Sequence, residues 1–174
     1  MYNRLVNYLN INKILADNQY GFRKDHSTYM PLLKMINDIT NELENKNYSL
    51  GVFIDLSKAF DTVDHKILIK KMYCYGVRGI VLDWFKNYLY NRMQYVSLNN
   101  VNSKILPVTC GVPQGSILGP LLFILFINDI TNISTSTKLI MFADDTNLFF
   151  KHENVNELFA NVNKELQKYQ NGLN

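Results

Sequence analysis

Two adjacent aspartates, Asp144 and Asp145, interrupt an apolar stretch near the carboxyl end of the sequence. Residues 139–143 before them and residues 148–150 after them are all aliphatic, aromatic or Met. Each flank therefore predicts a strand, and the pair predicts the tight turn of a hairpin. Two carboxylates about 4 Å apart repel each other by roughly 4 kcal/mol at an effective dielectric of ~20, and a cation normally relieves this repulsion. The pair is either a turn with two solvated acids or part of a divalent-metal site.

A third carboxylate, Asp55, directly follows another apolar run, residues 48–54, which predicts a buried strand. Asp64 has a structural role as the cap of a following helix, whereas Asp55 has no such role. If the strands are neighbours in one antiparallel sheet, Asp55 and the aspartate pair converge. Oxygen ligands with no His or Cys nearby favour Mg²⁺ or Mn²⁺. Such a site suits two-metal displacement at phosphorus.

Two loops could bind phosphate or nucleotide. Residues 18–28 carry Arg23 beside aromatic residues, so this loop is either a solvated connector or a phosphate-binding loop that uses the guanidinium fork. Residues 110–120 contain three Gly and two Pro and present Gln114 at their centre. This second loop is either a rigid connector or a contact to a ligand backbone or base.

The elements that must position these residues follow from apolar periodicity and turn signals. His65 is expected to be a surface or capping residue at the start of a helix. The predicted helices cover residues 2–15, 29–45, 65–75, 80–90, 121–130 and 155–169. The predicted strands are 48–54, a pair at 93–98 and 105–109 around Asn99-Asn100, and the two runs beside Asp144-Asp145.

Composition sets broad limits. The chain has 174 residues, 47% of them hydrophobic, so it is long and apolar enough for one folded domain. A net charge of +3 permits a nucleic-acid partner without indicating one. The two cysteines lack metal-type spacing and are expected to be free thiols. No apolar run approaches the ~20 residues of a membrane span, so we expect a soluble intracellular protein of the cytoplasm or nucleus.

Three motifs in this order resemble the central motifs of reverse transcriptases, specifically those of non-LTR (LINE-like) retrotransposons. They are residues 53–61 (FIDLSKAFD), residues 111–120 (GVPQGSILGP) and residues 142–145 (FADD). Residues 19–24 (QYGFRK) resemble the fingers-region motif of the same family. Each motif is weak alone, but the ordered set is specific and the resemblance spans nearly the whole chain.

The resemblance implies an α+β fold: a right-hand polymerase palm, in which an antiparallel sheet packs on helices, with partial fingers and no thumb. Residues from about 1 to 47 would be partial fingers. Residues from about 48 to 174 would be mostly palm, with a fingers-side segment around 76–110. Because the family has further sequence on both sides, the chain is expected to be a reverse transcriptase domain truncated at both ends, without the endonuclease of full-length elements.

The resemblance also implies site residues. Asp55, Asp144 and Asp145 match the catalytic metal-binding aspartates, and the carbonyl of Leu56 matches a further metal ligand. Phe60 matches the bulky residue under the incoming sugar that excludes a 2′-hydroxyl. The other implied nucleotide contacts are Arg23 and the backbone of Lys58 and Ala59 at the triphosphate, and Gln114 and Gly115 at the incoming nucleotide and template.

The implied activity is RNA-directed DNA polymerisation with two Mg²⁺ ions, or Mn²⁺ in their place. Its partners would be an RNA template, a DNA primer and deoxynucleoside triphosphates, with no membrane; the sequence does not set an oligomeric state. One alternative is a catalytically silent remnant that folds and at most binds nucleic acid weakly. A two-metal nuclease or phosphatase would explain the carboxylates but not Phe60 or the loop at residues 111–115.

Overall fold

The computed structural model describes residues 1–134 and 136–173 of the chain. They divide into two compact units, which are described separately. Unit 1 contains Met1, Asn3–Ser57 and Ile127–Asn174, and unit 2 contains Tyr2 and Lys58–Phe126. In sequence, unit 2 is therefore almost entirely an insertion into unit 1.

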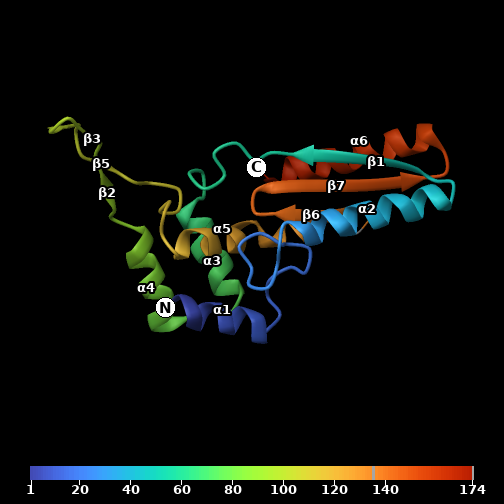
Figure 1. Cartoon of the computed structure of the whole chain (residues 1–174). Coiled ribbons are helices and arrows are strands. Elements are labelled where there is room, and N and C mark those ends of the chain that lie inside the picture. Colours follow the sequence, from blue (N-terminus) through green and yellow to red (C-terminus); the bar gives the residue numbers. More distant parts are fainter. Residues whose placement is uncertain (135, 174) are drawn as a thin grey trace. The chain divides into compact units, whose positions relative to one another are not determined.

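Unit 1 is built on a three-stranded antiparallel sheet in the order β1-β7-β6 (Figure 1). Its strands are β1 (Tyr48–Ile54), β6 (Lys138–Phe142) and β7 (Asp145–His152). These three strands match the predicted ones, but the prediction that β1 is buried is wrong. Phe53 is 68% exposed and no residue of β1 is fully buried, whereas β6, the other edge strand, is mostly buried. An apolar run predicts a strand but does not show whether other segments cover its faces.

Four helices complete unit 1: α1 (Tyr2–Ile11), α2 (Tyr29–Glu44), the 3₁₀ helix η1 (Asn128–Asn132) and α6 (Val155–Leu173). Helix α2 contacts β1 and β6, and α6 contacts β7 and β1. Tyr20, Ile140 and Phe149 form a buried cluster against which Met35 and Ile39 of α2 pack. Only part of the apolar stripe of α2 therefore meets the sheet, and its other members, among them Leu33 and Leu43, are exposed.

Helix α1 is shorter than predicted because a Schellman motif ends it. Lys13 has a φ of +50°, its N–H donates to the carbonyl of Asn10 (3.1 Å), and the N–H of Ile14 donates to the carbonyl of Leu9 (2.9 Å). The apolar residues Ile14 and Leu15 continue the pattern in sequence but lie beyond the helix.

Unit 2 contains α3 (His65–Cys74), α4 (Gly79–Leu89) and α5 (Leu118–Ile127), whose last residue falls in unit 1. Helix α5 is apolar on all sides and buried along most of its length. It begins three residues earlier than predicted and passes into η1 at Asn128 rather than remaining an α-helix to residue 130.

The predicted strand pair in unit 2 forms two short antiparallel ladders: β2 (Met93–Gln94) with β5 (Leu106–Pro107), and β3 (Ser97–Leu98) with β4 (Val101–Asn102). The turn at the tip is the predicted one. Asn99 and Asn100 have φ values of +48° and +63°, as a two-residue type I′ turn requires.

Among the described residues, the structure contains no helix with both the length and the apolar character needed to cross a membrane.

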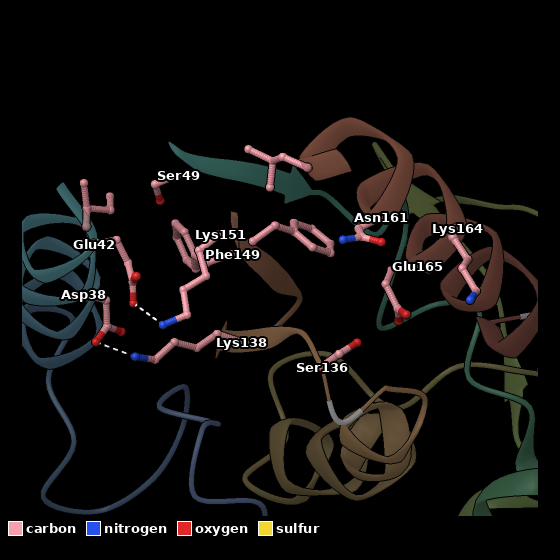
Figure 2. A pocket seen from close by; sticks show the side chains of 13 residues that line it. Asp38, Glu42, Ser49, Ser136, Lys138, Phe149, Lys151, Asn161, Lys164 and Glu165 are labelled. Carbon is pink, nitrogen blue, oxygen red and sulfur yellow. Dashed lines mark hydrogen bonds and ion pairs between the residues drawn. The ribbon is translucent and has the colours of Figure 1, made fainter. Parts of the chain in front are cut away.

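Two ion pairs join α2 to the sheet (Figure 2). Asp38 pairs with Lys138 of β6, and Glu42 Oε1 accepts from Lys151 Nζ of β7 at 2.6 Å. Both pairs line a pocket of about 480 Å³ that contains none of the predicted site residues. The pKa of Glu42 is lowered, first by the hydrogen bond from Lys151 and then by that from Asn47 (2.9 Å).

This pair predicts an acid-sensitive contribution to stability. A carboxyl whose pKa is lower in the folded chain stabilises it above the unfolded pKa and loses that effect as the pH falls through the folded value. We expect Glu42→Gln to lower the free energy of unfolding modestly at about pH 7 and to match the unsubstituted chain at about pH 2.5. Urea titrations at both pH values measure this, with Glu44→Gln on the same helix as control. An equal loss at both pH values would contradict the ion-pair explanation.

Candidate active site

Strands β6 and β7 are joined by a two-residue loop, Ala143 and Asp144, closed by the pairing of Phe142 with Asp145. The turn therefore lies one residue earlier than predicted, and Asp145 is the first residue of β7. Ala143 takes the corner position with a φ of +56°. Two-residue hairpin loops need positive φ to match the twist of the strands. For a residue other than Gly this costs roughly 1–2 kcal/mol, which surrounding contacts must offset.

The sheet brings Asp55 beside Asp145. The ladder between β1 and β7 ends at the pair Ile54 and Thr146, so Asp55 and Asp145 are the next residues on the two strands. Both are exposed and both line one open pocket of about 510 Å³, which the first turns of α2 also line. The condition that these two strands be neighbours in one antiparallel sheet is met. Leu56 follows Asp55 and is half-buried.

Asp144 is half-buried in the turn and does not line this pocket. Within residues 1–134 and 136–173, no three His, Cys, Asp or Glu side chains lie close enough to hold a metal ion. The structure thus places Asp55 and Asp145 together, but it does not bring three carboxylates close enough to form a complete metal site. The full ligand set stays a prediction.

Among the residues that the structure describes, no basic side chain forms an ion pair with any of these three aspartates. In the described part of the chain, the Lys and His ion pairs involve other acids. Oxygen-only donors suit Mg²⁺, which is commonly bound by one or two carboxylates together with substrate phosphates and water. The Asp55 and Asp145 pair fits that kind of partial coordination.

The loop that carries Arg23 is buried at its start and mostly exposed after Gly21. Gln19, Tyr20 and Gly21 are buried, and Gln19 forms a parallel bridge with Met141 of β6. Arg23 is half-buried and donates from Nη1 to the carbonyls of Ala16 (2.8 Å) and Gln19 (3.3 Å). The guanidinium therefore has a structural role in its own loop, and its contact to a triphosphate stays a prediction.

In unit 2, the segment at residues 58–63 lies beside the Gly-rich loop. The N–H of Val112 donates to the carbonyl of Phe60 and the N–H of Gly111 to the carbonyl of Val63, both at 2.8 Å. Gln114 Nε2 donates to Asp61 Oδ1 at 2.6 Å. The structure thus brings Phe60 and Gln114, two predicted nucleotide contacts, into one hydrogen-bonded cluster.

The other predicted residues of this cluster differ in exposure. Lys58 is exposed with a φ of +53°, and Ala59 is buried. The half-buried Phe60 ring lies 4.5 Å from that of Phe123, centroid to centroid. Gly115 has a φ of +77° and open space where a Cβ would stand.

His65 is a residue that the sequence interpretation placed wrongly. It is 3% exposed, and its Nε2 lies 2.6 Å from the carbonyl oxygen of Gly111, so it supports the Gly-rich loop. Asp64 caps α3 as predicted, accepting from the N–H of Ile67 at 2.8 Å. The missed signal was helical spacing, since the buried residues Leu68, Ile69 and Met72 put His65 on the core face of α3.

A sequence model of one family, "Reverse transcriptase (RNA-dependent DNA polymerase)", matches residues 1–174. The chain belongs to the reverse transcriptase family. This confirms the resemblance drawn from the ordered motifs, including its origin in non-LTR mobile elements, from which the similar curated proteins come.

Three relatives from Drosophila melanogaster show the extent of the match. The chain is 32% identical to the RNA-directed DNA polymerase from mobile element jockey over 97% of its own length and 19% of that protein. It is 34% identical to the probable RNA-directed DNA polymerase from transposon BS, over 89% of the chain and 18% of the relative. It is 33% identical to the probable RNA-directed DNA polymerase from transposon X-element, over 82% of the chain and 16% of the relative. This reverse transcriptase chain thus spans less than a fifth of each relative.

The Gly-rich loop of this reverse transcriptase yields a stability prediction. A Cβ at Gly111, where φ is +86°, would lie 2.9 Å from Asp61 Cα and from its carbonyl oxygen. Gly115→Ala meets a similar φ cost without a clash. We expect Gly111→Ala to lower the free energy of unfolding by roughly 1–3 kcal/mol more than Gly115→Ala does, as measured by urea denaturation. An equal decrease in the free energy of unfolding for both variants would mean that the loop can move away from Asp61 without loss of stability.

Proposed function

We propose that this chain is an RNA-directed DNA polymerase domain that adds deoxynucleotides to a primer 3′-hydroxyl by two-metal phosphoryl transfer. The observation that carries the proposal is the strand register that sets Asp55 beside Asp145, in a chain of the reverse transcriptase family. An RNA template, a DNA primer and deoxynucleoside triphosphates are the partners that this activity requires, in the cytoplasm or nucleus.

The proposed metal ligands are Asp55, Asp144, Asp145 and the carbonyl of Leu56. Bound Mg²⁺, or Mn²⁺, would activate the primer hydroxyl and neutralise the leaving pyrophosphate. The chain's own contribution is to hold carboxylates at the ends of two hydrogen-bonded strands. Strands position such groups more accurately than loops do.

The proposed nucleotide contacts are Arg23 in unit 1 and, in unit 2, Lys58, Ala59, Phe60, Gln114 and Gly115. Support for the second group comes from the hydrogen bonds that join residues 58–63 to the Gly-rich loop. We assign the sheet of unit 1 to the palm of a right-hand polymerase, residues 1–47 to partial fingers and residues around 76–110 to a fingers-side segment.

The activity test is primer extension on a poly-rA template with an oligo-dT primer. We expect Asp144→Ala and Asp55→Asn each to abolish extension, because each removes a proposed metal ligand. Asp83→Asn is the control, since Asp83 is an exposed acid paired with Lys86 in α4 (2.9 Å). Extension that survives either site substitution would refute the site assignment.

Phe60 gives a separate prediction about sugar selection. We expect Phe60→Val to raise kcat/KM for ribonucleotides relative to deoxynucleotides by tenfold or more, on the order of what a change in pocket size produces. The ratio matters because Phe60 also packs on Phe123, and a loss of stability would lower both rates together. An unchanged ratio would make Phe60 a packing residue only.

A second candidate is a catalytically silent remnant that folds and binds nucleic acid weakly. The observation that favours it is that the described residues hold no three metal-ligating side chains close enough to bind an ion. Primer extension separates the two candidates: activity that depends on the aspartates excludes the remnant, and binding of the template-primer without extension supports it.

A further inference from the structure

The side chain of Gln19 forms hydrogen bonds to both backbone polar groups of Ala143 in the hairpin turn. Its Oε1 accepts hydrogen bonds from the N–H of Ala143 (2.9 Å) and the N–H of Gly21 (2.8 Å). Its Nε2 donates to the carbonyl of Ala143 at 3.2 Å. A side-chain amide carries both the donor and the acceptor that this arrangement needs. Because Gln19 is only 1% exposed, water does not compete for these bonds.

The backbone around Gln19 fixes its distance from the turn. The N–H of Met141 donates to the carbonyl of Asn18, and the N–H of Tyr20 donates to the carbonyl of Met141, both at 2.9 Å. Gly21 packs so closely that a Cβ there would lie 2.1 Å from the nitrogen of Ala143. The loop therefore extends the sheet past β6 and brings the amide of Gln19 to the turn.

The residue that Gln19 holds in the hairpin loop has an unfavourable backbone conformation. Ala143 has a φ of +56°, and the chain leaves it directly into Asp144 and Asp145. A rotation of the Ala143 peptide would redirect Asp144, which follows it, and would strain the pairing of Phe142 with Asp145 that closes the turn. Two hydrogen bonds from one buried amide, to the N–H and the carbonyl of Ala143, oppose that rotation.

We infer that Gln19 is a positioning residue for the aspartates of the hairpin, acting through the backbone of Ala143. This inference rests on the proposed function, because the direction of the carboxylates matters only if they bind metal. Groups that orient metal ligands from outside the coordination sphere typically change metal affinity or activity about 10–100-fold when removed.

A matched control exists in the same unit. Asn128 is also a buried side-chain amide, 8% exposed, that accepts from the N–H of Ala16 and donates to the carbonyl of Ile14, both at 2.8 Å. Its bonds hold the start of the loop and do not reach the turn. Asn128→Leu therefore shows the effect of losing a buried side-chain amide. Gln19→Met shows that effect together with the loss of the hydrogen bonds to Ala143.

The test uses the full chain labelled with ¹⁵N and Mn²⁺ alone as the probe. Mn²⁺ titrations follow paramagnetic broadening of the Asp55 and Asp145 amide signals, and hydrogen exchange follows the amides of Gly21 and Ala143. We expect Gln19→Met to weaken Mn²⁺ binding about 10–100-fold and to speed exchange at Ala143. Asn128→Leu should lower stability while leaving Mn²⁺ affinity within about twofold of the unsubstituted chain.

Each other outcome overturns a defined statement. Unchanged Mn²⁺ affinity in Gln19→Met, or equal weakening in both variants, would show that Gln19 is structural only. Absence of broadening at Asp55 and Asp145 in the unsubstituted chain would overturn the proposed metal site itself, and with it this role for Gln19. If Gln19→Met does not fold, Gln19→Asn replaces it, because the shorter amide stays polar but cannot reach both the N–H and the carbonyl of Ala143.

Discussion

The register of β7 against its two neighbours is the constraint on which the proposed site depends. Successive residues of a strand point to opposite faces, so a slip of one residue would exchange the two faces of β7. In the observed register Thr146 is fully buried and Asp145 is exposed next to Asp55. Burial of Leu148 and Phe150 on the Thr146 side makes the alternative register costly. Packing of the core thus determines where the carboxylates lie.

Charge in unit 1 follows two patterns. Several acids have basic partners: Asp38 and Glu42 tie α2 to the sheet, and within α6 the hydrogen bond from Lys168 lowers the pKa of the buried Glu165. At the ends of β1 and β6, by contrast, acids gather without basic partners in the described part of the chain. Concentrated, unrelieved negative charge is a poor choice for stability alone and a suitable one for attracting a cation.

Much of this arrangement could be predicted from local pattern, and the failures have a common cause. Strand β1, the Asn99-Asn100 turn and the Asp64 cap follow from apolar runs, turn chemistry and capping rules that act within a few residues. The helical spacing of α3 already indicated that His65 is buried, but the exposure of β1 and the hydrogen bond of His65 to the Gly111 carbonyl depend on which distant segments pack beside them. A local pattern carries no record of those partners.

The candidate site shows the same division. The ordered motifs singled out the aspartates as candidates. The order of the strands in the sequence could not prove that β1 and β7 are neighbours. The hold of Gln19 on Ala143 joins residues more than a hundred positions apart and depends on a parallel bridge at Met141. In the sequence, Asn18, Gln19 and Tyr20 are simply polar or aromatic residues of a loop, and nothing about them predicts pairing with Met141.

The pairing of β1 with β7 also has a kinetic meaning. Ile54 and Thr146 are separated by about 90 residues, and almost all of unit 2 lies within that connection. Closing so long a loop costs entropy before the ladder returns any hydrogen bonds, and contacts of high sequence separation form slowly. A ribosome must also release residue 145 before Asp55 can find its neighbour. We expect the carboxylate pair to be among the last features of unit 1 to form, after the local helices and the β6–β7 hairpin already exist.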